Sequence, residues 1–273
     1  MPELRDITYS QEAAVAAVRG YYAFLSKMYL MESFVLEPPK DGWPFITAEN
    51  MRALGKTDKV ISLLRHLPYI SSADEHKHPE AVPKCVFADW QSIGKRLPND
   101  AELAEEARVV SENASFYQHV PPHVISLTYG PEDDFIFLLD TELGIVHWVD
   151  AGDKIRFDPS REPISDDAYD YAPEDEADAW RGNAPAWAIP NFFELLKDQY
   201  RRLHFVPVSP WQLYDTDAPN FSSEQAMLAM VQDIYRQHGW PDMEQYRKED
   251  CLRAVHNALE EQYPDGADSR FDE

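Results

Sequence analysis

The stretch from His123 to Asp150 constrains the fold more than any other part of the chain. It contains two short apolar runs, Phe135–Leu139 and Ile145–Val149, rich in the β-branched and aromatic residues that favour strands. Between them lies Asp140–Gly144, a short connection whose final glycine can adopt a positive φ. We therefore predict a β-hairpin over residues 135–149, with residues 124–128 supplying the preceding strand.

The alternation of side chains along the hairpin predicts strands that are covered on both faces. In the first run one face takes Ile136, Leu138 and Asp140, and the other takes Phe135, Phe137 and Leu139. In the second run His147 shares a face with apolar neighbours and lies opposite Trp148. Apolar residues on both faces are typical of a strand with protein on each side.

Nearly all of the remaining chain has the pattern of helix or loop. Ser10 is a candidate N-cap for a helix to about residue 31, and Thr57 caps a second helix over 58–67. A capping box at Ser222–Gln225 and a further helix over 241–263 complete the pattern. The sequence thus predicts a single α+β domain over 1–273, a small antiparallel sheet wrapped by helices, with a C-terminal helical lobe at 204–263.

Composition excludes several classes of function. The 273 residues carry a formal net charge of −24, which disfavours binding to nucleic acid or to an anionic membrane surface. Two cysteines, Cys85 and Cys251, lack metal-ligand spacing and are expected in the core. No signal peptide or membrane-spanning run is present in the sequence, so we expect a cytoplasmic protein.

The segment from Asp158 to Arg181 is the most acidic part of the chain, with nine carboxylates against two arginines. Its three prolines and lack of apolar periodicity predict an exposed loop, and the calcium-loop register is absent. We expect it to attract a basic protein partner. The candidate binding carboxylates are Asp166, Asp167, Glu174, Asp175 and Glu176, and the candidate aromatic anchors beside them are Trp180 and Trp187.

Three residues are candidates for acid–base chemistry, namely His147, Asp140 and His66. A histidine and an aspartate on neighbouring strands can act as a general base and the group that orients it. The alternative is a partly buried histidine satisfied by a local acceptor, and for His66 a cationic side chain near a helix C-terminus. His76, His78 and Cys85 do not form a metal-binding pattern, so neither a metal nor another cofactor is expected.

Two resemblances add to this interpretation. Between Gly42 and Ile70 the patterns Gly-Trp-Pro, Leu-Gly-Lys-Thr and Leu-Leu-Arg-His-Leu-Pro-Tyr resemble a family of filamentous-fungal proteins of uncharacterised function, which implies a fungal origin. A second set of residues is similar to the later half of the SUKH superfamily of cell-wall assembly regulators and toxin-immunity domains. Its members here are Leu138, Leu139, Asp140, Thr141, Gly144, Val146, Phe193, Glu194, Leu195 and Leu196.

The SUKH resemblance implies an intracellular, non-catalytic module that binds proteins or acts as a scaffold. The competing hypothesis is an enzyme that acts on a small molecule in a pocket lined by the many aromatic residues, with His147, Asp140 and His66 as its acid–base groups.

Overall fold

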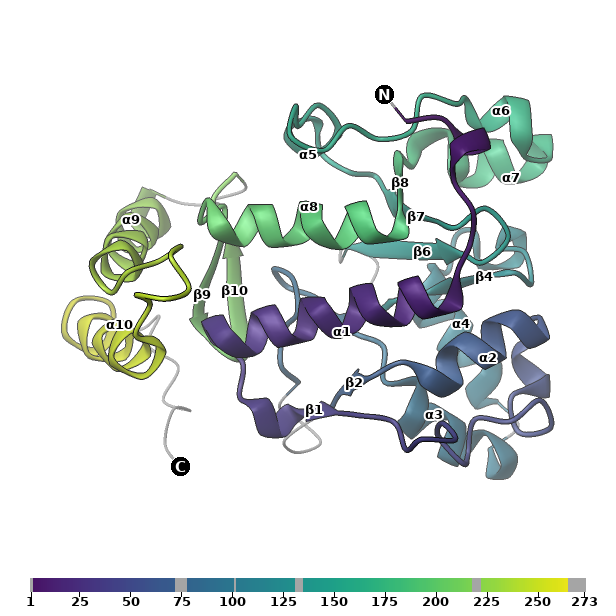
Figure 1. The fold of residues 1–273 in the computed structure, drawn as a ribbon, viewed down its shortest axis with the longest axis horizontal. Helices are drawn as coiled ribbons and strands as arrows, with labels where there is room; N and C mark the ends of the chain where they lie inside the picture. The colour runs from purple at the N-terminus through teal and green to yellow at the C-terminus, as the bar shows by residue number, and fades with distance from the viewer. Residues whose placement is uncertain (1, 72–77, 101, 131–134, 218–221, 265–273) are drawn as a thin grey trace.

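The computed structural model describes residues 2–71, 78–100, 102–130, 135–217 and 222–264 (Figure 1). The chain has an α+β fold. Its helices are α1 (Gln11–Met28), α2 (Asp58–His66), α3 (Trp90–Arg96), α4 (Leu103–Glu112), α5 (Asp153–Arg156), α6 (Ala168–Tyr171), α7 (Glu174–Ala179), α8 (Ile189–Arg201), α9 (Ser222–Gln237) and α10 (Lys248–Gln262). Short 3₁₀ turns include η5 (Tyr117–His119) and η6 (Arg181–Asn183).

The central sheet has the strand order β4-β6-β7-β8 and is antiparallel throughout. Its strands are β4 (Val124–Ser126), β6 (Ile136–Asp140), β7 (Ile145–Val149) and β8 (Ala186–Ala188). Three two-stranded sheets lie around it, formed by β1 (Val35–Leu36) with β2 (Tyr69–Ile70), β3 (Val86–Phe87) with β5 (Thr128–Tyr129), and β9 (Phe205–Ser209) with β10 (Gln212–Asp215). The hairpin over 135–149 and the preceding strand are confirmed.

The turn between β6 and β7 is closed by its own residues. The side chain of Asp140 accepts hydrogen bonds from the backbone N–H groups of Glu142 and Leu143, at 2.8 and 2.9 Å. Gly144 has φ of +74°, and a Cβ there would lie 2.8 Å from the backbone nitrogen of Tyr9. The glycine is therefore required both by the conformation of the turn and by the close approach of the N-terminal segment.

One face of the central sheet, here called the core face, packs against α8, and α1 lies side by side with α8 (Figure 1). Phe137 and Trp148 on this face contact Phe192 of α8, with ring centroids 4.9 and 6.4 Å apart. Ser10 caps α1 as expected, because its hydroxyl accepts a hydrogen bond from the N–H of Ala13. This face contributes to the large apolar core of the chain.

The opposite face, here called the outer face, is covered by α6, α7 and the turns around them. Leu138 and Val149 pack there with Phe116, Trp180 and their neighbours in a separate small cluster. All side chains of β7 are buried, as are those of β6 from Phe137 onward. The prediction that the hairpin is covered on both faces is therefore confirmed.

The segment 158–181 differs from the exposed loop expected from its sequence. It contains the short helices α6 and α7, and Ala168, Ala177 and Trp180 within it are buried. Asp158 is also buried, and its carboxylate accepts hydrogen bonds from the side chains of Gln199 and Arg202. Helices of four and six residues are too short to give an apolar period, which is why the pattern was not visible.

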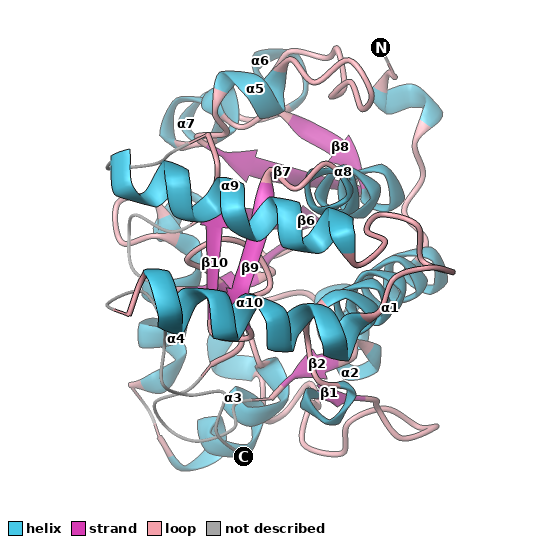
Figure 2. Ribbon diagram, turned by 90° about the vertical axis from the view of Figure 1, so that its left-hand side faces the viewer, coloured by secondary structure: helices cyan, strands magenta, loops and turns pink. Residues whose placement is uncertain are grey.

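The C-terminal helices pack on the hairpin of β9 and β10 (Figure 2). Val231, Tyr235, Cys251 and Val255 belong to the same apolar cluster as α1 and α8. The last helix begins at Lys248 rather than near Pro241, because residues 241–247 form turns after the positive-φ Gly239. Cys85 and Cys251 are both buried, as predicted.

Candidate functional site

The outer face of the sheet is organised around one buried arginine, Arg181. Its Nη1 donates to Nε2 of His147 at 3.1 Å, and its Nη2 donates to Oδ2 of Asp140 at 3.2 Å. Its Nε donates to the carboxylate of Glu176 on α7 at 3.0 Å. The guanidinium also lies 4.5 Å from the ring centroid of Trp180. We call these residues the Arg181 clamp, because they join α7 to both strands of the central hairpin.

Asp140 is ionised within the Arg181 clamp. Burial alone would raise the pKa of this carboxyl, since the charged form loses its hydration. The contact with His123, the charge of Arg181 and the N–H of Leu143 outweigh that penalty and hold the pKa at about 2. His123 reaches the same oxygen, with its Nε2 3.6 Å from Oδ2 of Asp140.

His147 is a neutral imidazole with a defined tautomer. Its Nδ1 is 3.2 Å from the carbonyl oxygen of Ala184, to which it donates, and its Nε2 accepts from Arg181. Burial and the neighbouring guanidinium lower the pKa of His147 to about 4. A general base needs a free lone pair, but the lone pair on Nε2 of His147 already accepts the hydrogen bond from Arg181. The imidazole ring also has no exposed surface.

The three acid–base candidates do not meet in one site. Asp140 and His147 are joined only through Arg181, and both are fully buried. His66 lies on α2, where its Nδ1 contacts the carbonyl oxygen of Ser62 at 2.8 Å and the side-chain amide of Gln11 at 3.3 Å. The structure thus favours the alternative in which each histidine is satisfied by local partners.

Most of the predicted binding carboxylates are exposed on or beside α6 and α7. Asp167 caps α6 through a hydrogen bond from the N–H of Tyr169, and Asp166 accepts from the N–H of Leu4. Glu174 and Asp175 are exposed in the first turn of α7. Glu176 is the exception, because its carboxylate turns inward to Arg181 and its side chain is only 15% exposed.

The two predicted aromatic anchors are not at the surface. Trp180 is 2% exposed, stacks near Phe116, and donates from its indole N–H to the carbonyl oxygen of His119. Trp187 is 1% exposed and lies on the core face of β8, where its indole donates to the carbonyl oxygen of Arg161. Neither indole is available to a partner, so the prediction of an exposed tryptophan hot spot is wrong. The exposed aromatic residue nearest the carboxylates in sequence is Tyr169 on α6.

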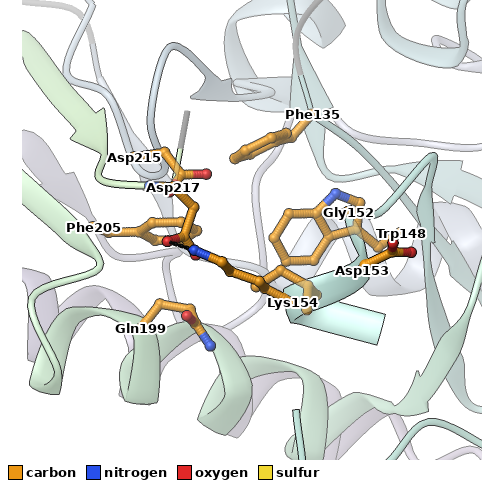
Figure 3. A pocket seen from close by; sticks show the side chains of 10 residues that line it. Phe135, Trp148, Gly152, Asp153, Lys154, Gln199, Phe205, Asp215 and Asp217 are labelled. Atoms are coloured by element: carbon orange, nitrogen blue, oxygen red, sulfur yellow. Dashed lines mark hydrogen bonds and ion pairs between the residues drawn. The ribbon is translucent and has the colours of Figure 1, made fainter. Parts of the chain in front are cut away.

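A cavity of about 270 Å³ lies on the core side of the hairpin, between α5, α8 and the β9–β10 hairpin (Figure 3). Its apolar walls are Phe135, Trp148 and Phe205, and its polar groups are Asp153, Lys154, Gln199, Asp215 and Asp217. None of His66, Asp140 and His147 lines it. The chain therefore has an aromatic-lined pocket, but the acid–base residues expected to serve it lie elsewhere.

Sequence reasoning missed both Arg181 as the centre of the clamp and the polar residues of this cavity. Arg181 is 41 positions from Asp140, so no local spacing connects them. The strands that carry Phe205 and Asp215 were obscured by Pro207 and Pro210, which lie within and directly after β9. The alternation of Phe205, Pro207 and Ser209 with Val206 and Val208 was the available signal.

Comparisons of the chain with models of protein families, with curated proteins and with solved structures find no match. Among the described residues, no helix is both long enough and apolar enough to cross a membrane. Within the same part of the chain, no three His, Cys, Asp or Glu side chains are grouped closely enough to hold a metal ion. His76, one member of the histidine pair considered above, lies outside the described residues.

Proposed function

We propose that the protein is a non-catalytic binding module that recognises a basic partner protein through its acidic face. This acidic face consists of the exposed side chains of Asp166, Asp167, Asp170, Glu174, Asp175 and Asp178. A cytoplasmic, SUKH-like protein-binding module of fungal origin is the form of this proposal that the sequence resemblances favour.

The observation that carries the proposal is the Arg181 clamp. Burying an arginine with two carboxylates costs solvation free energy, and an apolar cluster of the same volume is often equally stable or more so. What the ionic arrangement provides is position, since it ties α7 to β6 and β7 through three directed hydrogen bonds. The effect is to present the remaining carboxylates on an ordered surface instead of a free loop.

An ordered acidic surface suits recognition of a basic partner. Rim charges raise the association rate and select against acidic competitors, while a desolvated aromatic contact supplies much of the affinity. Tyr169 replaces the buried tryptophans as the aromatic candidate, because it is 56% exposed and lies between Asp167 and Asp170. Its hydroxyl donates to Asp178, which fixes the ring against α7.

The enzyme hypothesis is supported less well by the geometry. A general base must reach a substrate proton, and the buried Nε2 of His147 is already bonded to Arg181. His66 is bonded to groups outside the aromatic cavity. The cavity itself supports ligand binding without requiring catalysis.

The proposal can be tested with two charge-matched triple variants. Asp170→Asn/Glu174→Gln/Asp175→Asn removes three exposed carboxylates from the acidic face that are outside the Arg181 clamp. Glu12→Gln/Glu49→Gln/Glu244→Gln removes three exposed carboxylates from other regions. Association of each protein with a panel of lysine- and arginine-rich peptides is then measured at low and high salt, with Tyr169→Ala as a third variant.

We expect at least one basic peptide to bind the wild type and the control variant with an association rate that falls as salt rises. The acidic-face variant should bind it at least about tenfold more slowly, and Tyr169→Ala should release it faster. Equal binding by both triple variants would place the interaction elsewhere. Failure of every basic peptide to bind the wild type would reject the proposal.

A further inference from the structure

The cavity shown in Figure 3 combines aromatic walls with an excess of carboxylates. Phe135 lies 4.9 Å from Trp148 and 6.2 Å from Phe205, measured between ring centroids. The three rings come from the residue before β6, from β7 and from β9; Trp148 and Phe205 belong to the large apolar core, and Phe135 packs against it. Phe135 is half-buried and presents aromatic surface to the cavity, whereas Trp148 and Phe205 are 2% and 1% exposed and support it from behind.

Charged groups line the remaining wall. Asp153, Asp215 and Asp217 contribute three carboxylates, and Lys154 contributes one ammonium group. Lys154 is paired with Asp217, and Figure 3 shows its side chain reaching across the cavity toward that carboxylate. Asp215 is half-buried at the end of β10, and Oδ1 of its carboxylate accepts a hydrogen bond from the N–H of Asp217. The lining thus has more negative than positive charge, which disfavours an anionic ligand.

The environment of the Asp215 carboxyl also favours a cationic ligand. Burial is the main cause that raises the pKa of its carboxyl; the hydrogen bond from the N–H of Asp217 lowers that pKa in part, and the charge of the Asp217 carboxylate raises it. A carboxylate held in this way is stabilised by any cation that enters beside it, since the added charge offsets the lost hydration.

We propose that this cavity binds a small organic cation of the quaternary ammonium class. The cation's methyl groups would lie against the accessible part of the Phe135 ring, and its charge beside Asp215 and Asp217. Aromatic faces attract such cations through their ring quadrupoles, and the attraction grows when water is excluded. The volume of about 270 Å³ is below the range of pockets for drug-sized ligands and suits a head group of this kind.

Lys154 has a defined part in this proposal. Its ammonium group forms an ion pair with Asp217, so it competes with an incoming cation for the same carboxylate. The side chain is 71% exposed, and an exposed ion pair of this kind is readily exchanged. The Lys154 ammonium therefore takes the place beside Asp217 that the charge of the ligand would occupy. Replacing Lys154 with an uncharged residue should strengthen binding of the cation. An anion-binding cavity would respond in the opposite way.

The test uses three probes of nearly the same shape and different charge: choline, the neutral 3,3-dimethylbutan-1-ol and the anionic 3,3-dimethylbutanoate. Binding to the full chain is measured by titration calorimetry, and melting temperature is measured at equal ionic strength. We expect choline to bind with a millimolar dissociation constant and to raise the melting temperature. The neutral probe should bind at least about tenfold more weakly, and the anion should not bind.

Variants then assign the binding to this cavity. Asp215→Asn should weaken choline binding about tenfold, whereas Lys154→Gln should strengthen it about threefold. Glu49→Gln changes the net charge as Asp215→Asn does, but lies outside the cavity and should leave binding unchanged. Because Lys154 and Asp217 are on the surface, Lys154→Gln and Asp217→Asn remain usable if Asp215→Asn does not fold.

Equal affinity for choline and for its neutral analogue would show that the cavity recognises only apolar surface, which would overturn the proposal. Weaker choline binding by Lys154→Gln, or tighter binding of the anion than of the cation, would also overturn it. The inference does not depend on the acidic face, since none of its six residues lines the cavity. Loss of peptide binding in the acidic-face variant would therefore leave choline binding intact.

Discussion

The two faces of the central hairpin are held by different kinds of interaction. On the core face Phe137, Trp148 and Phe192 form a closely packed aromatic group without charge. On the outer face Asp140, His147 and Arg181 are equally buried, but they are joined by charge and hydrogen bonds. The same two strands thus carry an uncharged aromatic group on one side, and on the other side an ionic contact beside the small apolar cluster of Leu138 and Val149.

The two faces therefore have different roles: one mainly stabilises the folded chain, and the other mainly positions the helices that cover it. An apolar contact depends on shape and is nearly indifferent to pH, whereas a buried ionic contact depends on the protonation of each member. We infer that the core face supplies most of the folding free energy, while the outer face fixes where α6 and α7 lie. Substitutions on the two faces should therefore differ in pH dependence as well as in size.

The largest effect is expected from the core face. Phe137→Ala removes a fully buried ring that contacts four aromatic neighbours, namely Phe87, Phe135, Trp148 and Phe192. It should lower the free energy of unfolding by about 3–5 kcal/mol. Urea unfolding should give nearly the same loss at neutral and at mildly acidic pH, because no titrating group is changed. A loss confined to acidic pH would contradict the proposed contrast.

Arg181→Met should have the next largest effect. It leaves Asp140 buried without its guanidinium partner, and breaking a buried pair of this kind costs about 3 kcal/mol or more. The loss should shrink as pH falls toward the usual aspartate pKa, since protonation removes the uncompensated charge. Urea unfolding across this pH range is the measurement, and a loss that does not vary with pH would contradict the assigned role of Asp140.

The third effect is the pH dependence that His147 gives to the wild type. Its folded pKa of about 4 lies below the ordinary histidine pKa of 6.5, so the unfolded chain binds a proton more readily. Stability from this residue is present above pH 6.5 and is lost as pH falls toward 4, by up to about 3 kcal/mol. His147→Gln should flatten the slope in this window, and an unchanged slope would reject the assignment.

Replacement of the whole clamp should cost least. Asp140→Asn/His147→Phe/Glu176→Gln/Arg181→Met removes the charged partners together, so no charge of the clamp is left buried, and an amide oxygen remains to accept from the N–H groups of Glu142 and Leu143. Its stability at neutral pH should exceed that of Arg181→Met by about 1–4 kcal/mol. The quadruple variant should nevertheless show weaker hydrogen-exchange protection of the α7 amides, because the bonds that position this helix are gone. Stability below that of the single variant would show that the ionic contact is also a net source of folding free energy.

The sequence predicted the strands well and the clamp poorly, for one physical reason. Side-chain alternation is local, so it correctly assigned Leu138 and His147 to one face and Trp148 to the other. Arg181 reaches Asp140 and His147 only because of the path that residues 158–181 take. The two helices in that segment are too short to show an apolar periodicity in the sequence. The burial of Trp180 and Trp187 follows from that same path, and an acidic flanking sequence gave no sign of it.

Hydrogen exchange tests most directly whether Arg181 positions the acidic helices on the sheet. In the wild type the amides of Ala172, Ala177 and Trp180 are bonded to helix carbonyl groups and should be measurably protected. In Arg181→Met we expect these amides to approach the exchange rate of an unprotected peptide, while Leu139 and Val146 remain at least about a hundredfold slower. Equal protection of α6 and α7 in the two proteins would contradict the account.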